Sequence, residues 1–115
     1  MAITMQDKRL DYRIRLNLPI SYRVRGEGGL ERIHTNDISA GGLSFIAHKF
    51  IAPATCMNME IAVYDKMVTP IGSIAWTEPL AHSNRYRIGI KFIEFNPRDK
   101  EYLSDYIRIL SDRLL

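Results

Sequence analysis

Five residues in the first half of the chain have types and a spacing suited to holding an anionic ligand. They form two short patterns, Arg9-x-x-x-Arg13 and Asp37-x-Ser39-x-x-Gly42. Arginine donates paired hydrogen bonds to phosphate oxygens or to O6 and N7 of guanine, whereas lysine offers only a point charge. A carboxylate accepts from the donor edge of a base, a hydroxyl bonds to phosphate or base, and glycine lets the backbone approach closely. The chemistry indicated is ligand binding.

The elements around these patterns predict that they meet in space. Over residues 14–24 apolar and polar residues alternate, which predicts a strand with one face in the core. Pro19 cannot donate a ladder hydrogen bond, so we expect an edge or a bulge there. A glycine-rich loop follows, and residues 30–38 are expected to pair back as the second strand of a hairpin. An antiparallel return of similar length brings Asp37 close to Arg13.

The rest of the chain predicts further strands and one helix. Strands are expected over residues 43–50, 57–63, 67–76 and 86–95, separated by turn residues. Asn96 is suited to cap a helix, and apolar residues recur at helical spacing up to Leu114. This order predicts a mainly β protein, a six-stranded antiparallel β-barrel with a C-terminal α-helix over about residues 96–114. The helix must bury its apolar face, across a barrel opening or against a partner.

Length and composition fit one small domain. The chain has 115 residues and a net charge of +3, which suits an anionic partner. Residues 1–13 are polar and lack any period, so we expect a flexible N-terminal arm, with the barrel and its helix in residues 14–115. The chain has no apolar run long enough for a membrane span. The start lacks a secretory signal and Cys56 is the only cysteine, which favours a cytoplasmic location.

The two patterns, in this order and joined by a predicted hairpin, resemble the signature of the PilZ family, whose members are bacterial receptors for cyclic di-GMP. The resemblance extends from Lys8 to the C-terminal helix and includes the segment 87–92. It implies a PilZ-like split barrel, no enzymatic activity, and no cofactor apart from the ligand, cyclic di-GMP. It also implies an unidentified downstream protein in motility, exopolysaccharide production or virulence.

By the same resemblance, Arg9 and Arg13 grasp the ligand from a flexible N-terminal loop. Asp37, Ser39 and Gly42 contact guanine and phosphate from the barrel surface.

Three more residues are additional candidates for this site. Lys8 adds a third cation, which favours an intercalated pair of ligands over a single one. Gly41 adjoins Gly42 in the second pattern. Trp76 is suited to stack on guanine, although a tryptophan in the core or at the rim of a barrel explains it equally well.

Taken one at a time, the same residues have structural explanations. Arg9 and Arg13 are typical of solvated charges on an arm. Asp37 and Ser39 are typical of a turn in which both side chains bond to local backbone, with turn glycines after them. The match of order, spacing and predicted elements favours the ligand site.

Catalysis and metal binding have little support. Ser39 is not in a G-x-S-x-G elbow, since Asp37 holds the first glycine position. The three histidines, His34, His48 and His82, show no metal-ligand spacing.

Two alternatives to the receptor remain. One is a ligand-independent PilZ-type adaptor in motility or secretion. The other is a small basic β-barrel that binds single-stranded nucleic acid. The second is disfavoured because Tyr22, Tyr86 and Phe92 fall on the apolar phase of their predicted strands.

Overall fold

The computed structural model of the protein describes residues 13–114, which form a sheet of eight strands followed by a helix. The strands are β1 (Ile14–Arg15), β2 (Pro19–Val24), β3 (Glu31–Ser39), β4 (Gly42–Ala47), β5 (Cys56–Val63), β6 (Lys66–Val68), β7 (Ile71–Pro79) and β8 (Tyr86–Glu94), and the helix is α2 (Pro97–Leu114).

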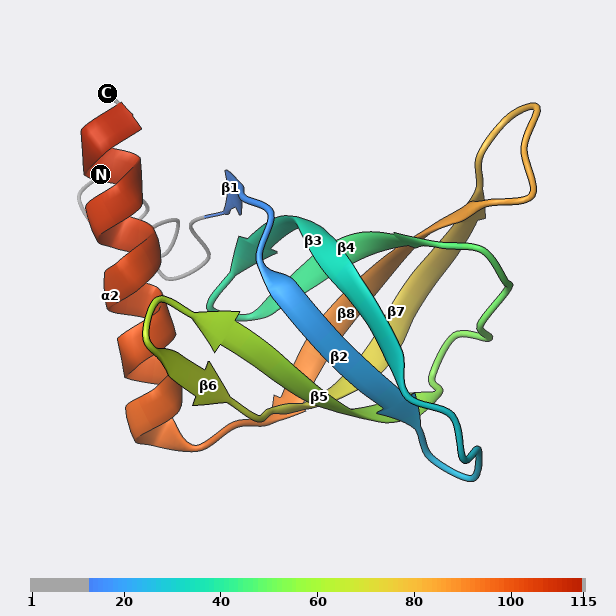
Figure 1. The fold of residues 1–115 in the computed structure, drawn as a ribbon, viewed down its shortest axis with the longest axis horizontal. Helices are drawn as coiled ribbons and strands as arrows, with labels where there is room; N and C mark the ends of the chain where they lie inside the picture. Colours follow the sequence, from blue (N-terminus) through green and yellow to red (C-terminus); the bar gives the residue numbers. More distant parts are fainter. Residues whose placement is uncertain (1–12, 115) are drawn as a thin grey trace, which may run out of the picture.

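Six of these strands close into an antiparallel barrel (Figure 1). The order around it is β3-β2-β5-β7-β8-β4, and β4 pairs back onto β3. The two short strands lie outside this ring: β1 pairs with one end of β3, and β6 with one end of β5. The predicted fold class, a six-stranded antiparallel barrel with a C-terminal helix, is confirmed.

Two predicted strands are divided in the structure. Between β1 and β2, the side chain of Thr35 in β3 takes the place of the backbone partner in the strand pairing. Its hydroxyl accepts a hydrogen bond from the backbone N–H of Leu18 at 2.8 Å and donates one to the carbonyl of Leu16. The strand expected over residues 67–76 divides into β6 and β7 at Pro70, whose nitrogen cannot donate a ladder hydrogen bond.

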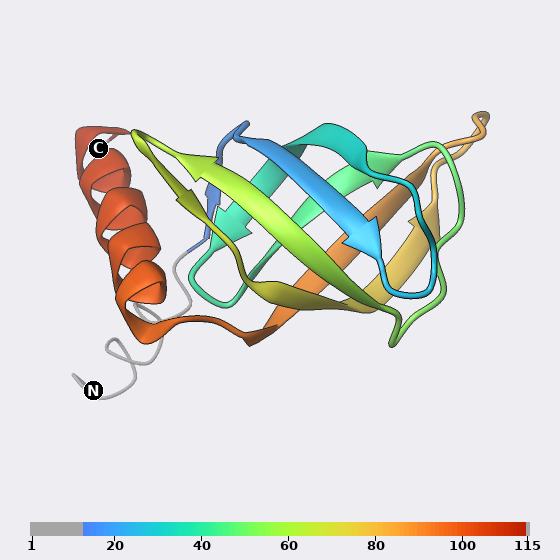
Figure 2. The same ribbon diagram turned by 60° about the horizontal axis from the view of Figure 1, so that its bottom comes forward.

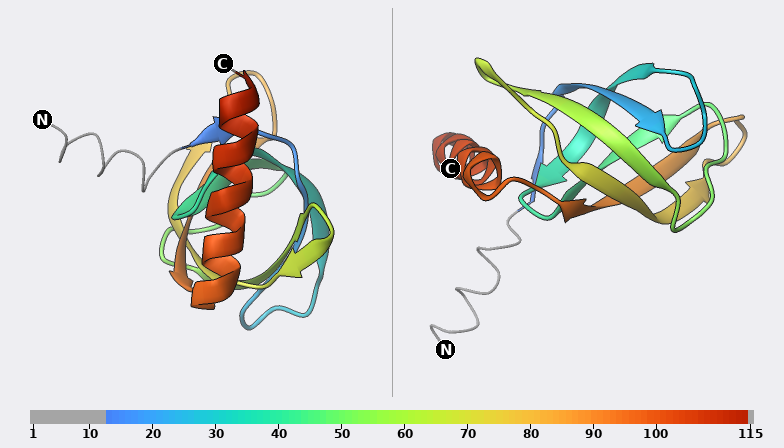
Figure 3. Two further views of the ribbon diagram at one scale, coloured as in Figure 1. Left: turned by 90° about the vertical axis from the view of Figure 1, so that its left-hand side faces the viewer. Right: turned by 90° about the horizontal axis from the view of Figure 1, so that it is seen from below.

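The C-terminal helix lies across one open end of the barrel (Figure 3). Asn96 caps it as predicted, since its side-chain oxygen accepts from the N–H of Arg98 at 2.9 Å. Leu103 and Ile107 are fully buried in the barrel core. The middle of the apolar stripe is therefore buried within the same chain. In the described part of the chain, no helix is long and apolar enough to cross a membrane.

The β5–β6 hairpin extends to this helix and holds it in place (Figure 2). The hydroxyl of Tyr102 donates to the carboxylate of Asp65 at 2.8 Å, and Lys66 Nζ lies 2.9 Å from Asp99. The hydrogen bond to Asp65 raises the pKa of the Tyr102 phenol.

Tyr22 of β2 is a buried phenol whose ionisation opposes folding. It is 2% exposed, and its ring centroid lies 5.2 Å from that of Phe45. Burial, together with the carboxylates of Glu31 and Glu27, raises the pKa of Tyr22 to about 12 from 10.0. Because the folded state favours the protonated phenol, its contribution to stability is complete below the unfolded pKa. That contribution is lost as the pH rises through the folded pKa.

We expect Tyr22→Phe to remove this alkaline sensitivity. At about pH 11 the wild-type protein should lose about 1.4 kcal/mol of unfolding free energy through this group, and the variant should keep it. Urea unfolding of both proteins at about pH 8 and about pH 11 measures the difference. Equal losses in the two proteins would contradict the assignment to Tyr22.

Candidate ligand-binding cleft

Two β-bulges turn Asp37 and Trp76 out of the barrel. The β3–β4 register shifts between Thr35 and Asp37, so Thr35 is buried while Asp37 faces outward. The β7–β8 register shifts between Ile74 and Trp76, which are 2% and 44% exposed. In an unbroken strand, residues two apart lie on the same face, so each bulge reverses the direction of the residue that follows it.

Arg13 lies against the outward-facing end of β3. β1 pairs Arg15 with Asp37, and continuing that register places Arg13 opposite Ser39 and diagonal to Asp37. Arg13 Nη1 lies 2.5 Å from Asp37 Oδ1, and Nη2 donates to Ser39 Oγ at 3.5 Å. The two patterns thus meet at these three residues, as the hairpin geometry predicts.

Ser39 and Asp37 differ in what they bond. Ser39 is buried, and its hydroxyl accepts from the N–H of Gly41 at 3.2 Å and donates to the carbonyl of Gly42 at 3.4 Å. These bonds close the turn between β3 and β4, as the local-turn interpretation expects. Asp37 instead bonds across to Arg13, with a side chain that is 27% exposed. Asp37 therefore presents its carboxylate to a ligand more directly than Ser39 presents its hydroxyl.

Gly42 has a structural reason to be glycine. A Cβ at this position would lie 2.0 Å from the carbonyl oxygen of Ile90 and 3.3 Å from the Cα of Lys91. Both atoms belong to the backbone of β8, which pairs with β4 here. Gly42 thus allows β4 and β8 to approach closely beside the cleft.

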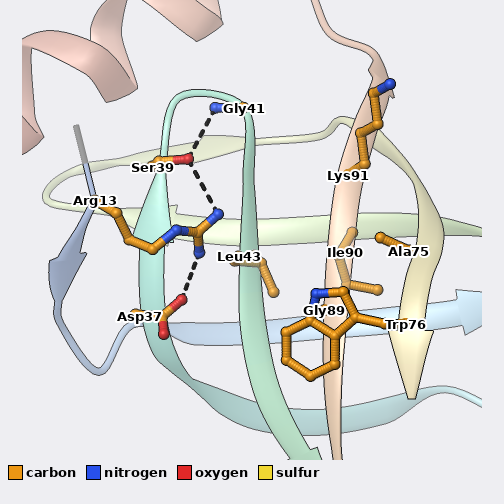
Figure 4. A pocket seen from close by; sticks show the side chains of 10 residues that line it. All are labelled: Arg13, Asp37, Ser39, Gly41, Leu43, Ala75, Trp76, Gly89, Ile90 and Lys91. Atoms are coloured by element: carbon orange, nitrogen blue, oxygen red, sulfur yellow. Dashed lines mark hydrogen bonds and ion pairs between the residues drawn. The ribbon is translucent and has the colours of Figure 1, made fainter. Parts of the chain in front are cut away.

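An open cleft of about 550 Å³ lies on the outer face of β3, β4, β8 and β7 (Figure 4). Strand pairing places Asp37, Ser44, Gly89 and Trp76 in one row across this face. The two middle residues are small, so the floor is low between the walls. The row spans three strand spacings, about 14 Å. The residues lining the cleft are Arg13, Asp37, Ser39, Gly41, Leu43, Ala75, Trp76, Gly89, Ile90 and Lys91.

The wall opposite Arg13 contains two residues, of which only one was predicted from the sequence. Trp76 was a candidate from its type alone, whereas Lys91 was missed. Its signal is the alternation in β8, where Ile88 and Ile90 are buried and Lys91 is exposed on the same outward phase as Gly89. The cleft therefore contains two cations, Arg13 and Lys91 on opposite walls, and one carboxylate, that of Asp37.

The remaining predicted site residues are Lys8 and Arg9. Like all of the expected arm except Arg13, they lie outside the described residues. Within residues 13–114, no group of three or more His, Cys, Asp or Glu side chains is placed to hold a metal ion.

The fold and the cleft define a small β-barrel domain with an open cleft on its outer face. The chain matches the PilZ domain family model over residues 7–108, and it belongs to this family. Comparison with curated protein sequences gives no match.

Two solved structures are similar in fold. The inhibitor of motility MotI/DgrA of Bacillus subtilis has a TM-score of 0.75 at 16% identity, over 88% of this chain and 51% of that one. The present chain thus spans about half the length of the Bacillus protein. A pathogenic protein from Xanthomonas campestris, described as a tetrameric PilZ domain self-assembled through a helical bundle, has a TM-score of 0.69 at 10% identity. The second alignment covers 98% of this chain and 97% of that one.

Proposed function

We propose that this protein is a receptor for cyclic di-GMP that signals to another protein. The observation that supports this most directly is the position of Arg13. Its side chain is 45% exposed and reaches Asp37 at one edge of a cleft whose opposite wall carries Trp76 and Lys91. An anionic guanine dinucleotide needs cations, an acceptor for the guanine donor edge and an aromatic surface, and this cleft offers all three.

Each wall of the cleft suits a different part of the ligand. The guanidinium of Arg13 can donate paired hydrogen bonds to a phosphate or to O6 and N7 of guanine. The carboxylate of Asp37 can accept from N1–H and N2–H of guanine. Across the cleft, the indole of Trp76 offers a stacking surface, and Lys91 adds a charge that favours phosphate.

Ligand binding would exchange one set of contacts of Arg13 for another. The Arg13–Asp37 pair is solvent-accessible, and pairs of this kind contribute about 0–1 kcal/mol. A ligand phosphate can therefore replace Asp37 at small cost. The exchange alters the charge of the surface beside β1, and a partner that distinguishes the two states would read it. Motility, as in the name of the Bacillus protein, is one such output.

Arg9 and Lys8 stay predicted contacts in this proposal, and an intercalated pair of ligands stays a prediction that depends on Lys8. The nucleic-acid alternative is less well supported. Tyr22 is buried, and Tyr86 and Phe92 are half-buried, so they do not form the exposed aromatic row that such barrels use.

Calorimetric titration of the purified protein with cyclic di-GMP tests the proposal, with GMP and cyclic AMP as controls. We expect saturable binding at micromolar or lower Kd, selective over both controls. The stoichiometry distinguishes one ligand from an intercalated pair. No heat of binding, together with no thermal shift at high ligand concentration, would contradict the proposal and favour the ligand-independent adaptor.

A further inference from the structure

The indole of Trp76 lies against the backbone of β8 at Gly89. Trp76 and Gly89 are cross-strand partners, and the ring crosses β8 at this glycine (Figure 4). A Cβ at position 89 would lie 2.2, 2.4 and 2.6 Å from the indole atoms Cε2, Nε1 and Cζ2. Any side chain at this position would thus exclude the observed placement of the ring.

The other buried glycines of the barrel have different neighbours. A Cβ at Gly72 would meet the side chains of Ile90 and Met59, and a Cβ at Gly42 would meet the backbone of β8. Of these three, Gly89 is the one whose missing side chain is replaced by the tryptophan that forms a wall of the cleft.

We infer that Gly89 is a positioning residue for ligand binding, which fixes the indole of Trp76 as the far wall of the cleft. This inference rests on the proposed function. The bulge before Trp76 turns the residue outward, and Gly89 then lets the ring lie down on the sheet. Ser44, its neighbour on β4, is also small, which keeps the floor low up to Asp37. A ring that is already in place loses little further freedom when a base stacks on it.

Fluorescence tests the placement without any ligand, because Trp76 is the only tryptophan in the chain. In Gly89→Ala the ring must leave β8, so we expect emission at longer wavelength and stronger quenching by acrylamide. Gly28→Ala is the exposed control, since its Cβ would meet nothing within 4 Å. Gly72→Ala is the buried control, because its Cβ would meet the side chains of Ile90 and Met59 and not the indole. Both controls should keep the wild-type emission.

Titration with cyclic di-GMP tests the consequence for binding. Gly89→Ala should raise Kd by about 5- to 150-fold, the range for one lost stacked base. In a double-mutant cycle, adding Gly89→Ala to Trp76→Ala should raise Kd no further, because the ring that Gly89 positions is already gone. A purely structural role of Gly89 would weaken binding in both backgrounds.

The outcomes separate this inference from the proposed function. If the wild-type protein binds and Gly89→Ala binds equally well, the inference is wrong and the receptor proposal stands. If the two substitutions are additive in the cycle, the inference is also wrong. If the wild-type protein does not bind, the proposed function fails. The fluorescence then decides alone whether Gly89 places the ring, and unchanged emission in Gly89→Ala overturns the inference.

Discussion

Replacing Arg13 with alanine is expected to weaken binding of cyclic di-GMP by about 30- to 5,000-fold. The substitution removes the guanidinium from the edge of the cleft and leaves Asp37 without its partner, so a carboxylate then repels the ligand phosphates. The fold should be unaffected, because a solvent-accessible ion pair contributes about 0–1 kcal/mol to stability. Calorimetry for the Kd and thermal unfolding for stability measure the two effects separately.

Arg15→Ala is the matched control for this experiment. Arg15 follows Arg13 by two residues, at the end of β1, and carries the same charge, but it forms no ion pair within residues 13–114 and does not line the cleft. We expect it to bind nearly as well as the wild type. Equal weakening in both variants would indicate a long-range effect of net charge, and unchanged binding by Arg13→Ala would contradict the receptor proposal. Adding Arg9→Ala to Arg13→Ala tests the other predicted arginine.

Gly42→Ala is expected to destabilise the whole barrel. The new methyl group would lie 2.0 Å from the carbonyl oxygen of Ile90, and only movement of β8 can relieve the clash. Overpacking of this kind costs about 1–3 kcal/mol, which lowers the midpoint of thermal unfolding by on the order of 10 °C. Urea and thermal unfolding measure the loss, and any loss of binding should follow from it.

Gly28→Ala controls for the general effect of replacing a glycine. Gly28 is exposed, and its Cβ would have no neighbour within 4 Å, so we expect a change within about 0.5 kcal/mol. A Gly42→Ala protein that is as stable as the wild type but does not bind would reverse the interpretation. Position 42 would then be glycine because it contacts the ligand, as the resemblance implies, and not because the packing of β4 on β8 requires it.

Strand alternation and the glycine-rich loop predicted most of the barrel, and they brought Asp37 to Arg13. The divisions of two strands were not predicted at their actual places. Pro19 indicated an irregularity, but β1 ends before it because the hydroxyl of Thr35 bonds the backbone at Leu18. Here a side-chain hydroxyl takes the place of a backbone partner, and that hydroxyl belongs to another strand, β3. The residue pattern of the first strand alone therefore does not reveal the break.

The cleft was predicted on one wall only. Simple alternation puts Trp76 on the same face as Ile74, in the core, and only the bulge between them turns the indole outward. A bulge is a property of the pairing of two strands, and β7 carries no glycine or proline there that marks it. Lys91 was missed for a related reason, because its position beside the cleft depends on the order of strands around the barrel.

The cleft is divided between distant parts of the chain. Arg13 and Asp37 come from its first third, Trp76 follows about forty residues later, and Lys91 lies further still along the chain. The two walls meet across the cleft through the pairing of β4 with β8. No fragment that lacks either part can assemble both walls, so a binding-competent site requires the closed barrel. The proposed ligand would therefore stabilise the barrel against any unfolding that separates the two walls. At a concentration 100 times Kd, the proposed ligand would add about 2.7 kcal/mol to the free energy of unfolding of the whole barrel.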